Sequence, residues 1–260
     1  MDQPFNESLN ESLISVQHLS FEYNKNQPIL RDISAEIKAG SFIGLTGSNG
    51  SGKSTFLQIL NGLIPHHIEG KMTGDVFVRE LNTKNSSTAE LAKTVGLLFQ
   101  NPDFSIFNLT VEDEVTFGAK NINLENIDLY VTKALEIVGL NHKKDANPHE
   151  LSMGQKQRLA LACVLAMNCQ VIALDEPSSM LDYRSSLDLY DHLKTLQKSG
   201  KTVLTIEHDT DYLWRYCTEI WVFDDGEIIA KGTPQQIFSE TEMLNRCGIK
   251  IPNMNLLSAD

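Results

Sequence analysis

The chain of 260 residues has few cysteines and little positive charge, and no long apolar segment. No apolar run is long enough to cross a bilayer, and the polar, acidic first residues do not resemble a signal peptide. Lys and Arg number 22 against 34 Asp and Glu, a net charge of −12, which argues against a nucleic-acid-coating surface. The spacing of the four cysteines matches neither zinc ligands nor a disulfide framework: Cys163, Cys169, Cys217 and Cys247. We expect reduced, mostly buried thiols in a cytoplasmic protein.

A glycine-rich segment is the most specific pattern in the chain. It fits G-x-x-x-x-G-K-[ST], the loop that wraps nucleotide phosphates. Its residues are Gly47, Ser48, Asn49, Gly50, Ser51, Gly52, Lys53, Ser54 and Thr55. The glycines let backbone N–H groups turn toward an anion, Lys53 reaches the β and γ phosphates, and Ser54 offers its hydroxyl to Mg²⁺. The segment therefore predicts a nucleotide site with Mg²⁺.

The surroundings of this loop favour a parallel-sheet α/β core. Residues 42–45 are typical of a buried strand and residues 55–60 of a helix, which would place the phosphates at a helix N-terminus. After residue 42, strands alternate with helices. Further strands are expected over 76–79, 95–99, 171–174, 202–206 and 220–223, and helices over 153–167 and 185–198. A tight hairpin is expected at Asp225-Gly226, and a last helix at Pro234.

Two acidic residues follow the buried strand expected over 171–174. They are Asp175 and Glu176, and they would face the crevice outside the carboxyl ends of the strands, where the phosphate loop also lies. Asp175 would hold Mg²⁺ through water, and Glu176 suits a general base that polarises the attacking water. The alternative is a pair of solvated acids that open a turn.

Polar residues also follow two other expected strands. His208 comes after the strand over 202–206, where a neutral imidazole would contact the γ-phosphate. Gln100 ends the strand over 95–99 and would contact Mg²⁺ and water. Taken alone, a histidine at such a position is more often structural or solvated, and a glutamine there is a weak signal.

The order of these motifs over about residues 14–238 resembles that of the ATP-binding cassette ATPases. The resemblance assigns residues 47–55 to Walker A, Gln100 to the Q-loop, 151–155 to the signature, 171–175 to Walker B, 179–182 to the D-loop and His208 to the switch. It implies that Tyr23 stacks on the adenine, although Tyr23 alone could equally be an exposed hairpin residue. Its neighbour Phe21 is expected in the core.

The signature departs from the family pattern at one position. The family usually has Ser-Gly-Gly-Gln, whereas this chain has Ser152-Met153-Gly154-Gln155. The resemblance implies that Ser152, Gly154 and Gln155 bind the γ-phosphate held by a second subunit, at a helix N-terminus. Ser152 and Gln155 also have the S-x-x-Q form of a capping box. Met153 would crowd the approach and weaken the partner's site.

Residues 99–118 resemble those of a narrower branch, the energy-coupling-factor ATPases of cobalt and vitamin importers. The residues that carry this resemblance are Phe99-Gln100-Asn101-Pro102-Asp103, then Phe107, then Thr110-Val111-Glu112-Asp113-Glu114-Val115-Thr116-Phe117-Gly118. The branch commonly has a glutamine where this chain has Ser105. Residues 248–252 resemble the start of its C-terminal extension, expected here in truncated form. The alternative is that 101–118 is the coupling lobe of any importer cassette.

These patterns predict a P-loop NTPase fold with a RecA-like parallel-sheet core, an N-terminal antiparallel β subdomain and a helical subdomain. The expected limits are a disordered tail over 1–13, an ATPase domain over 14–240 and a C-terminal extension over 241–260. The helical subdomain is expected over about 101–165. The antiparallel part begins with strands expected over 14–19 and 29–37, joined by a turn at 24–28.

The expected function is that of an ATPase subunit, using ATP and Mg²⁺, that powers a membrane importer. The chain would lie on the cytoplasmic face of the cell membrane, bind integral membrane subunits but no nucleic acid, and pair head to tail with a second cassette. That cassette is a second copy of the chain or a paralogue, and the presence of Met153 in the signature slightly favours a paralogue. The alternatives are a soluble cassette ATPase of translation or DNA repair, and a non-hydrolysing regulatory cassette.

Overall fold

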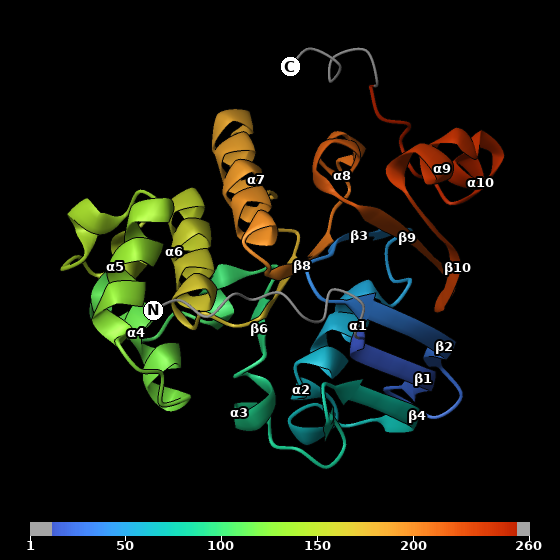
Figure 1. Ribbon diagram of the computed structural model, residues 1–260, viewed down its shortest axis with the longest axis horizontal. Coiled ribbons are helices and arrows are strands. Elements are labelled where there is room, and N and C mark those ends of the chain that lie inside the picture. The colour runs from blue at the N-terminus through green and yellow to red at the C-terminus, as the bar shows by residue number, and fades with distance from the viewer. Residues whose placement is uncertain (1–11, 254–260) are drawn as a thin grey trace.

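The computed structural model describes residues 12–253, and a six-stranded sheet lies at its centre (Figure 1). The strand order is β10-β9-β3-β8-β7-β6, in which all neighbours are parallel except β10 and β9. Every residue of β3, β7 and β8 is buried, because both faces of the sheet are covered. The strands are β3 (Phe42–Gly47), β6 (Val95–Leu98), β7 (Val171–Asp175), β8 (Thr202–Ile206), β9 (Glu219–Asp224) and β10 (Glu227–Gly232).

A second, antiparallel sheet has the order β2-β1-β4-β5. It contains β1 (Ser12–Glu22), β2 (Pro28–Lys38), β4 (Lys71–Val78) and β5 (Leu81–Asn82). Because β1 begins at Ser12 and Leu13 is buried, the expected tail over 1–13 is wrong for its last two residues. The rest of that tail, residues 1–11, lies outside the described part of the chain.

Helix α1 (Lys53–Leu60) joins the two sheets into one core. Its apolar side chains pack in the same cluster as those of β1, β2 and β4 and as one face of the central sheet. Along β7, Val171 and Ala173 face this core, whereas Ile172 and Leu174 face the other side, as alternation in a strand requires. Phe21 is 1% exposed and belongs to this core, as expected.

Most of the remaining helices pack against the other face of the central sheet. Figure 1 shows α4 (Val111–Asn121), α5 (Ile127–Ile137) and α6 (Met153–Ala166) grouped as a lobe, with α7 (Tyr183–Lys198) beside it. Together with α8 (Thr210–Tyr216), α9 (Pro234–Ser239) and α10 (Thr241–Arg246), they share one apolar core. The parallel-sheet core, antiparallel β subdomain and helical subdomain confirm the expected fold class.

Several short elements were not expected from the sequence. They are β5, α2 (Leu63–His66), α3 (Thr88–Leu91), α8, α10 and three turns of 3-10 helix at Pro102–Phe104, Asn141–Lys143 and Pro148–Glu150. The helix at Pro234 is not the last, because α10 follows it. These segments have seven residues or fewer, too few to show a helical or strand periodicity.

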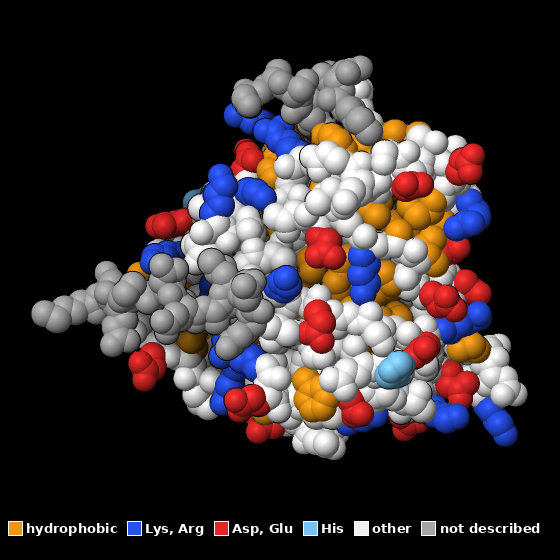
Figure 2. Space-filling model, turned by 45° about the vertical axis from the view of Figure 1, so that its right-hand side comes forward, with side chains coloured by type: hydrophobic (Ala, Val, Ile, Leu, Met, Phe, Trp, Pro, Cys, Tyr) orange, Lys and Arg blue, Asp and Glu red, His pale blue; other side chains and the backbone are white. Residues whose placement is uncertain are grey.

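The distribution of surface charge and the state of the cysteines agree with what the composition predicts. Figure 2 shows acidic and basic side chains interspersed over one face, with hydrophobic side chains gathered between them. All four cysteines are free, and Cys169, Cys217 and Cys247 are buried, as expected. Over residues 12–253, no helix has both the length and the apolar character needed to span a membrane.

Candidate functional site

The phosphate loop joins the end of β3 to the start of α1. At Gly47 φ is +136°, and a β-carbon there would lie 1.9 Å from the carbonyl oxygen of Phe223. At Gly52 φ is +98°, and a β-carbon would lie 2.5 Å from the Cδ2 of Leu30. Both positions therefore require glycine, because any side chain would clash and would disfavour the left-handed backbone. These glycines let the loop turn tightly into the N-terminus of α1, where free backbone N–H groups favour an anion.

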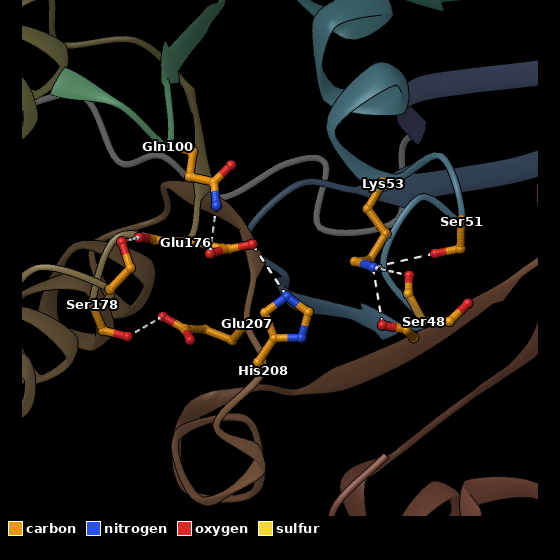
Figure 3. Close-up of polar contacts among 10 residues, drawn as sticks. Ser48, Ser51, Lys53, Gln100, Glu176, Ser178, Glu207 and His208 are labelled. Carbon is orange, nitrogen blue, oxygen red and sulfur yellow. Dashed lines mark hydrogen bonds and ion pairs between the residues drawn. The ribbon is translucent and has the colours of Figure 1, made fainter. Parts of the chain in front are cut away.

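Lys53 points into the phosphate loop and is only 5% exposed. Its Nζ donates to the carbonyl oxygens of Gly47 at 3.0 Å and Ser48 at 2.8 Å, and to the Ser51 hydroxyl at 3.2 Å (Figure 3). Burial lowers the pKa of the Lys53 ammonium, while the negative charges of Glu176 and Asp175 raise it. The cation is thus held inside the loop, on the side of the two carboxylates.

Asp175 ends β7 and is 7% exposed. Its Oδ1 is buried and has no hydrogen-bond partner among the described residues. Burial raises the pKa of the Asp175 carboxyl, and the neighbouring Ser54 hydroxyl and Lys53 charge lower it. A buried, unpartnered carboxylate oxygen beside a hydroxyl fits the all-oxygen ligation that Mg²⁺ prefers.

Gln100, Glu176 and His208 meet at the ends of β6, β7 and β8. The Gln100 Nε2 donates to Glu176 Oε2 at 2.9 Å, and His208 Nε2 lies 3.1 Å from Glu176 Oε1 (Figure 3). Glu176 has a left-handed backbone, with φ of +50°, which a non-glycine residue seldom adopts. Because β6, β7 and β8 are adjacent and parallel, side chains more than 100 positions apart in sequence reach one carboxylate.

Tyr23 lies beside the phosphate loop. Its phenol oxygen is 2.9 Å from the Thr55 hydroxyl, and its ring packs edge-to-face on Phe21 with centroids 4.8 Å apart. The residue remains 39% exposed. The structure therefore presents a partly exposed aromatic ring next to the phosphate loop.

The signature residues occupy the N-terminus of α6. Ser152 caps the helix: its Oγ accepts from the Gln155 N–H at 3.4 Å, and its N–H donates to Gln155 Oε1 at 3.0 Å. The predicted capping box is confirmed. Met153 is 42% exposed, and Gly154 lies against the backbone of Met180, since a β-carbon there would be 3.0 Å from that carbonyl oxygen. Among the described residues, no hydrogen bond joins 152–155 to the phosphate loop in the same chain.

Sequence analysis missed one buried acid next to this site. Glu207 is 3% exposed, directly precedes His208, and accepts hydrogen bonds from Ser178 and Tyr190. An acidic residue that directly follows an apolar strand is the signal that could have identified it.

Comparison with known proteins gives the family. The profile described as "ABC transporter" matches residues 30–179. A putative ABC transporter ATP-binding protein of Pyrococcus abyssi is 44% identical over 93% of this chain and 88% of its own length. The chain belongs to the ABC transporter ATP-binding family. As a member of this family, the chain is an ATPase.

Other similar proteins include transporter subunits with narrower names. The energy-coupling factor transporter ATP-binding protein EcfA1 of Caldanaerobacter subterraneus is 38% identical over 95% of this ABC ATPase and 90% of its own length. CbiO1 of Clostridium perfringens, part of the ABC transporter complex CbiONQ, superposes with a TM-score of 0.76 at 32% identity, over 95% and 99% of the two chains. The ATP-binding cassette MJ0796, solved as a dimer with ADP and Pi, gives a TM-score of 0.75 at 27% identity, over 85% and 98%.

Proposed function

We propose that this ABC ATPase is the ATP-hydrolysing subunit of an energy-coupling-factor importer for a vitamin or metal ion. The observation that carries the proposal is the meeting of Gln100, Glu176 and His208 at adjacent strand ends, on the side that Lys53 faces. The names of EcfA1 and CbiO1 support the branch. The transporter relatives do not favour a role in translation or DNA repair.

The site residues divide the chemistry of hydrolysis between them. Residues 47–55 bind the ATP phosphates, Tyr23 stacks on the adenine, and Ser54, Gln100 and Asp175 hold Mg²⁺, which neutralises phosphate charge when bound. Glu176 accepts a proton from the attacking water, and its carboxylate also accepts a hydrogen bond from Gln100. His208 orients the water and contacts the γ-phosphate.

Two cassettes pair head to tail in this proposal. Ser152, Gly154 and Gln155 face the nucleotide of the partner, in agreement with the absence, among the described residues, of any hydrogen bond between them and their own phosphate loop. The dimeric MJ0796 cassette supports such pairing. The partner of this chain is a second copy or a paralogue.

Met153 is expected to weaken the composite site that it faces. Its flexible side chain stands exposed at the first turn of α6, where a helix N-terminus has to approach phosphate oxygens closely. Met153→Gly should therefore raise turnover a few-fold, about 1 kcal/mol or less in barrier. The measurement is steady-state ATPase kinetics in the native complex.

Met153→Ala is the matched variant, because it keeps a helix-forming residue and removes the long side chain. Its turnover should fall between those of the wild type and Met153→Gly. If the chain works beside a paralogue, only one of the two sites should respond. Equal or lower turnover in Met153→Gly would show that the methionine is accommodated.

A surface in segment 100–118 is a candidate for docking to the membrane subunits. The sequence singled out its apolar residues, but Ile106, Val111 and Val115 are core residues, and the side chain of Phe104 lies outside the described part. Of the apolar residues that the sequence singled out, Phe107 is exposed, at 57%, and the structure adds Leu109 at 85% and Phe117 at 42%. Phe107 and Phe117 pack edge-to-face at 4.7 Å, and we call these three residues the coupling surface.

Leu109→Asp should release the chain from membranes and leave its basal ATPase activity nearly intact. Leu109 is the most exposed member of the coupling surface, so a charge there opposes burial against a partner without disturbing the core. The measurement is co-purification with integral membrane subunits, together with ATPase activity of the released chain.

Leu129→Asp is the control, because Leu129 is also exposed, at 51%, but lies on α5 outside the coupling surface. It should keep full membrane association. Full association of Phe107→Asp, Leu109→Asp and Phe117→Asp alike would exclude the coupling surface. Failure of the wild-type chain to co-purify with any membrane protein would contradict the importer assignment.

A further inference from the structure

Besides a backbone hydrogen bond from the Glu176 N–H to the Ile206 carbonyl at 3.2 Å, two side-chain links join the ends of β7 and β8. The outer link is the contact between Glu176 and His208 described above. The inner link is partly buried: the hydroxyl of half-buried Ser178 donates to Oε1 of buried Glu207 at 2.6 Å (Figure 3). Glu207 directly precedes His208, and Ser178 follows Glu176 by two positions, so both links connect the same two short segments.

Tyr190 of α7 is the third member of the inner link. Its phenol donates to Glu207 Oε1 at 2.8 Å and lies 3.2 Å from the Thr205 hydroxyl. The Tyr190 ring is fully buried and stacks on Tyr212, with centroids 4.9 Å apart and planes 8° apart. One carboxylate therefore ties together the end of β8, the segment after β7 and the middle of α7.

A carboxylate in this position is costly. Burial raises the pKa of Glu207, as does the nearby charge of Glu176, whereas the hydrogen bonds from Ser178 and Tyr190 lower it. A buried acid with such partners is often no more stabilising than an apolar side chain of similar size. A gain in stability therefore does not explain why position 207 is a glutamate. The hydrogen bonds that its carboxylate accepts from two hydroxyls do fix the relative positions of the end of β8, the segment after β7 and α7.

We propose that Glu207 is a positioning residue that sets Glu176 relative to His208. The backbone of Glu176 is left-handed, so the direction of its carboxylate depends on how the segment 176–178 is held. Glu207 is buried and holds that segment through Ser178, whereas the exposed side chain of His208 contacts Glu176 itself. The inference rests on the proposed role of Glu176 as the base.

Glu207→Leu should lower kcat about tenfold and leave KM for MgATP within about twofold, since small displacements of a catalytic group slow chemistry without affecting phosphate binding. Glu207→Gln should restore most of the lost kcat, because its amide oxygen accepts the same two hydrogen bonds. Steady-state kinetics of the full chain, assembled with its partner cassette, give both parameters. Equal kcat in wild type and Glu207→Leu would overturn the proposal.

Two tyrosine variants separate positioning from general loosening of the core. Tyr190→Phe removes a bond to Glu207 and keeps the ring stack, so kcat should fall with KM unchanged. Tyr216→Phe makes the same change in the same stack, but removes a 2.8 Å bond to Asp191 instead, so kcat should not change. An equal loss of kcat in both variants would assign the effect to the stack and contradict a role for Glu207.

Glu176→Gln distinguishes failure of this inference from failure of the proposed function. If Glu176→Gln retains turnover, the assignment of the base is wrong, and the inference fails with it. If Glu176→Gln is inactive while Glu207→Leu and Tyr190→Phe keep full kcat, only the positioning role of Glu207 is contradicted.

Discussion

Replacing Lys53 with alanine should abolish ATP hydrolysis and leave the fold intact. Lys53 supplies the one side-chain cation inside the phosphate loop, where burial strengthens its interaction with phosphate charge. Loss of a single preorganised electrostatic donor costs about 100- to 1,000-fold in kcat. The three hydrogen bonds of its Nζ all end within residues 47–51, so their removal leaves the rest of the molecule in place. The measurement is steady-state ATPase activity, with circular dichroism to check the fold.

Lys201→Ala is the matched control for this loss. Lys201 is also partly buried, its pKa is also lowered by burial, and its Nζ donates to the backbone and side-chain oxygens of Asn168 at 2.7 and 2.8 Å. It precedes β8, at the opposite end of that strand from His208. Lys201→Ala should cost stability but not turnover. Unchanged turnover in Lys53→Ala would show that the loop does not bind the phosphates.

The parts of the fold that the sequence predicts are those with strong local signals. The continuous apolar runs at β3, β7 and β8 are buried on both faces, and Ser152 with Gln155 forms the capping box that its spacing indicates. Elements with weak signals were missed, such as α8 and α10, because a single turn or two shows no periodicity. The local sequence pattern therefore predicts the long elements, whereas the short elements are determined by tertiary packing, which the pattern does not contain.

In the candidate site, too, the sequence predicts the local features and not the contacts that depend on tertiary packing. The sequence places Gln100, Glu176 and His208 after strands, but their meeting depends on β6, β7 and β8 being neighbours, which no local pattern contains. The position of Glu207 directly after an apolar strand is a local signal, but its partner Tyr190 lies on α7, in a different layer, and no local pattern contains that contact. The split of segment 100–118 into buried Ile106 and exposed Leu109 also follows from packing rather than from composition.

Glu176→Gln should stop hydrolysis while ATP remains bound. Glutamine keeps the shape of the side chain and an oxygen that accepts from Gln100, but it removes the group that takes the proton from water. Loss of a general base lowers the rate by about 100- to 10,000-fold. Because ATP is then retained between the phosphate loop of one cassette and the signature of the other, a stable dimer should form. Gel filtration with and without MgATP measures this dimer, and single-turnover assays measure hydrolysis.

Glu219→Gln is the control for the same chemical change elsewhere on the sheet. Glu219 begins β9 and accepts a hydrogen bond from the Trp221 Nε1 at 2.7 Å, which a glutamine oxygen can also accept. The turnover of the Glu219→Gln chain should equal that of the wild type, and ATP should not hold this variant as a stable dimer. A Glu176→Gln chain that stays monomeric with ATP, even with a paralogue supplied, would contradict head-to-tail pairing through the signature. A trapped dimer that still hydrolyses ATP at the wild-type rate would instead leave the pairing intact and remove Glu176 from the role of base.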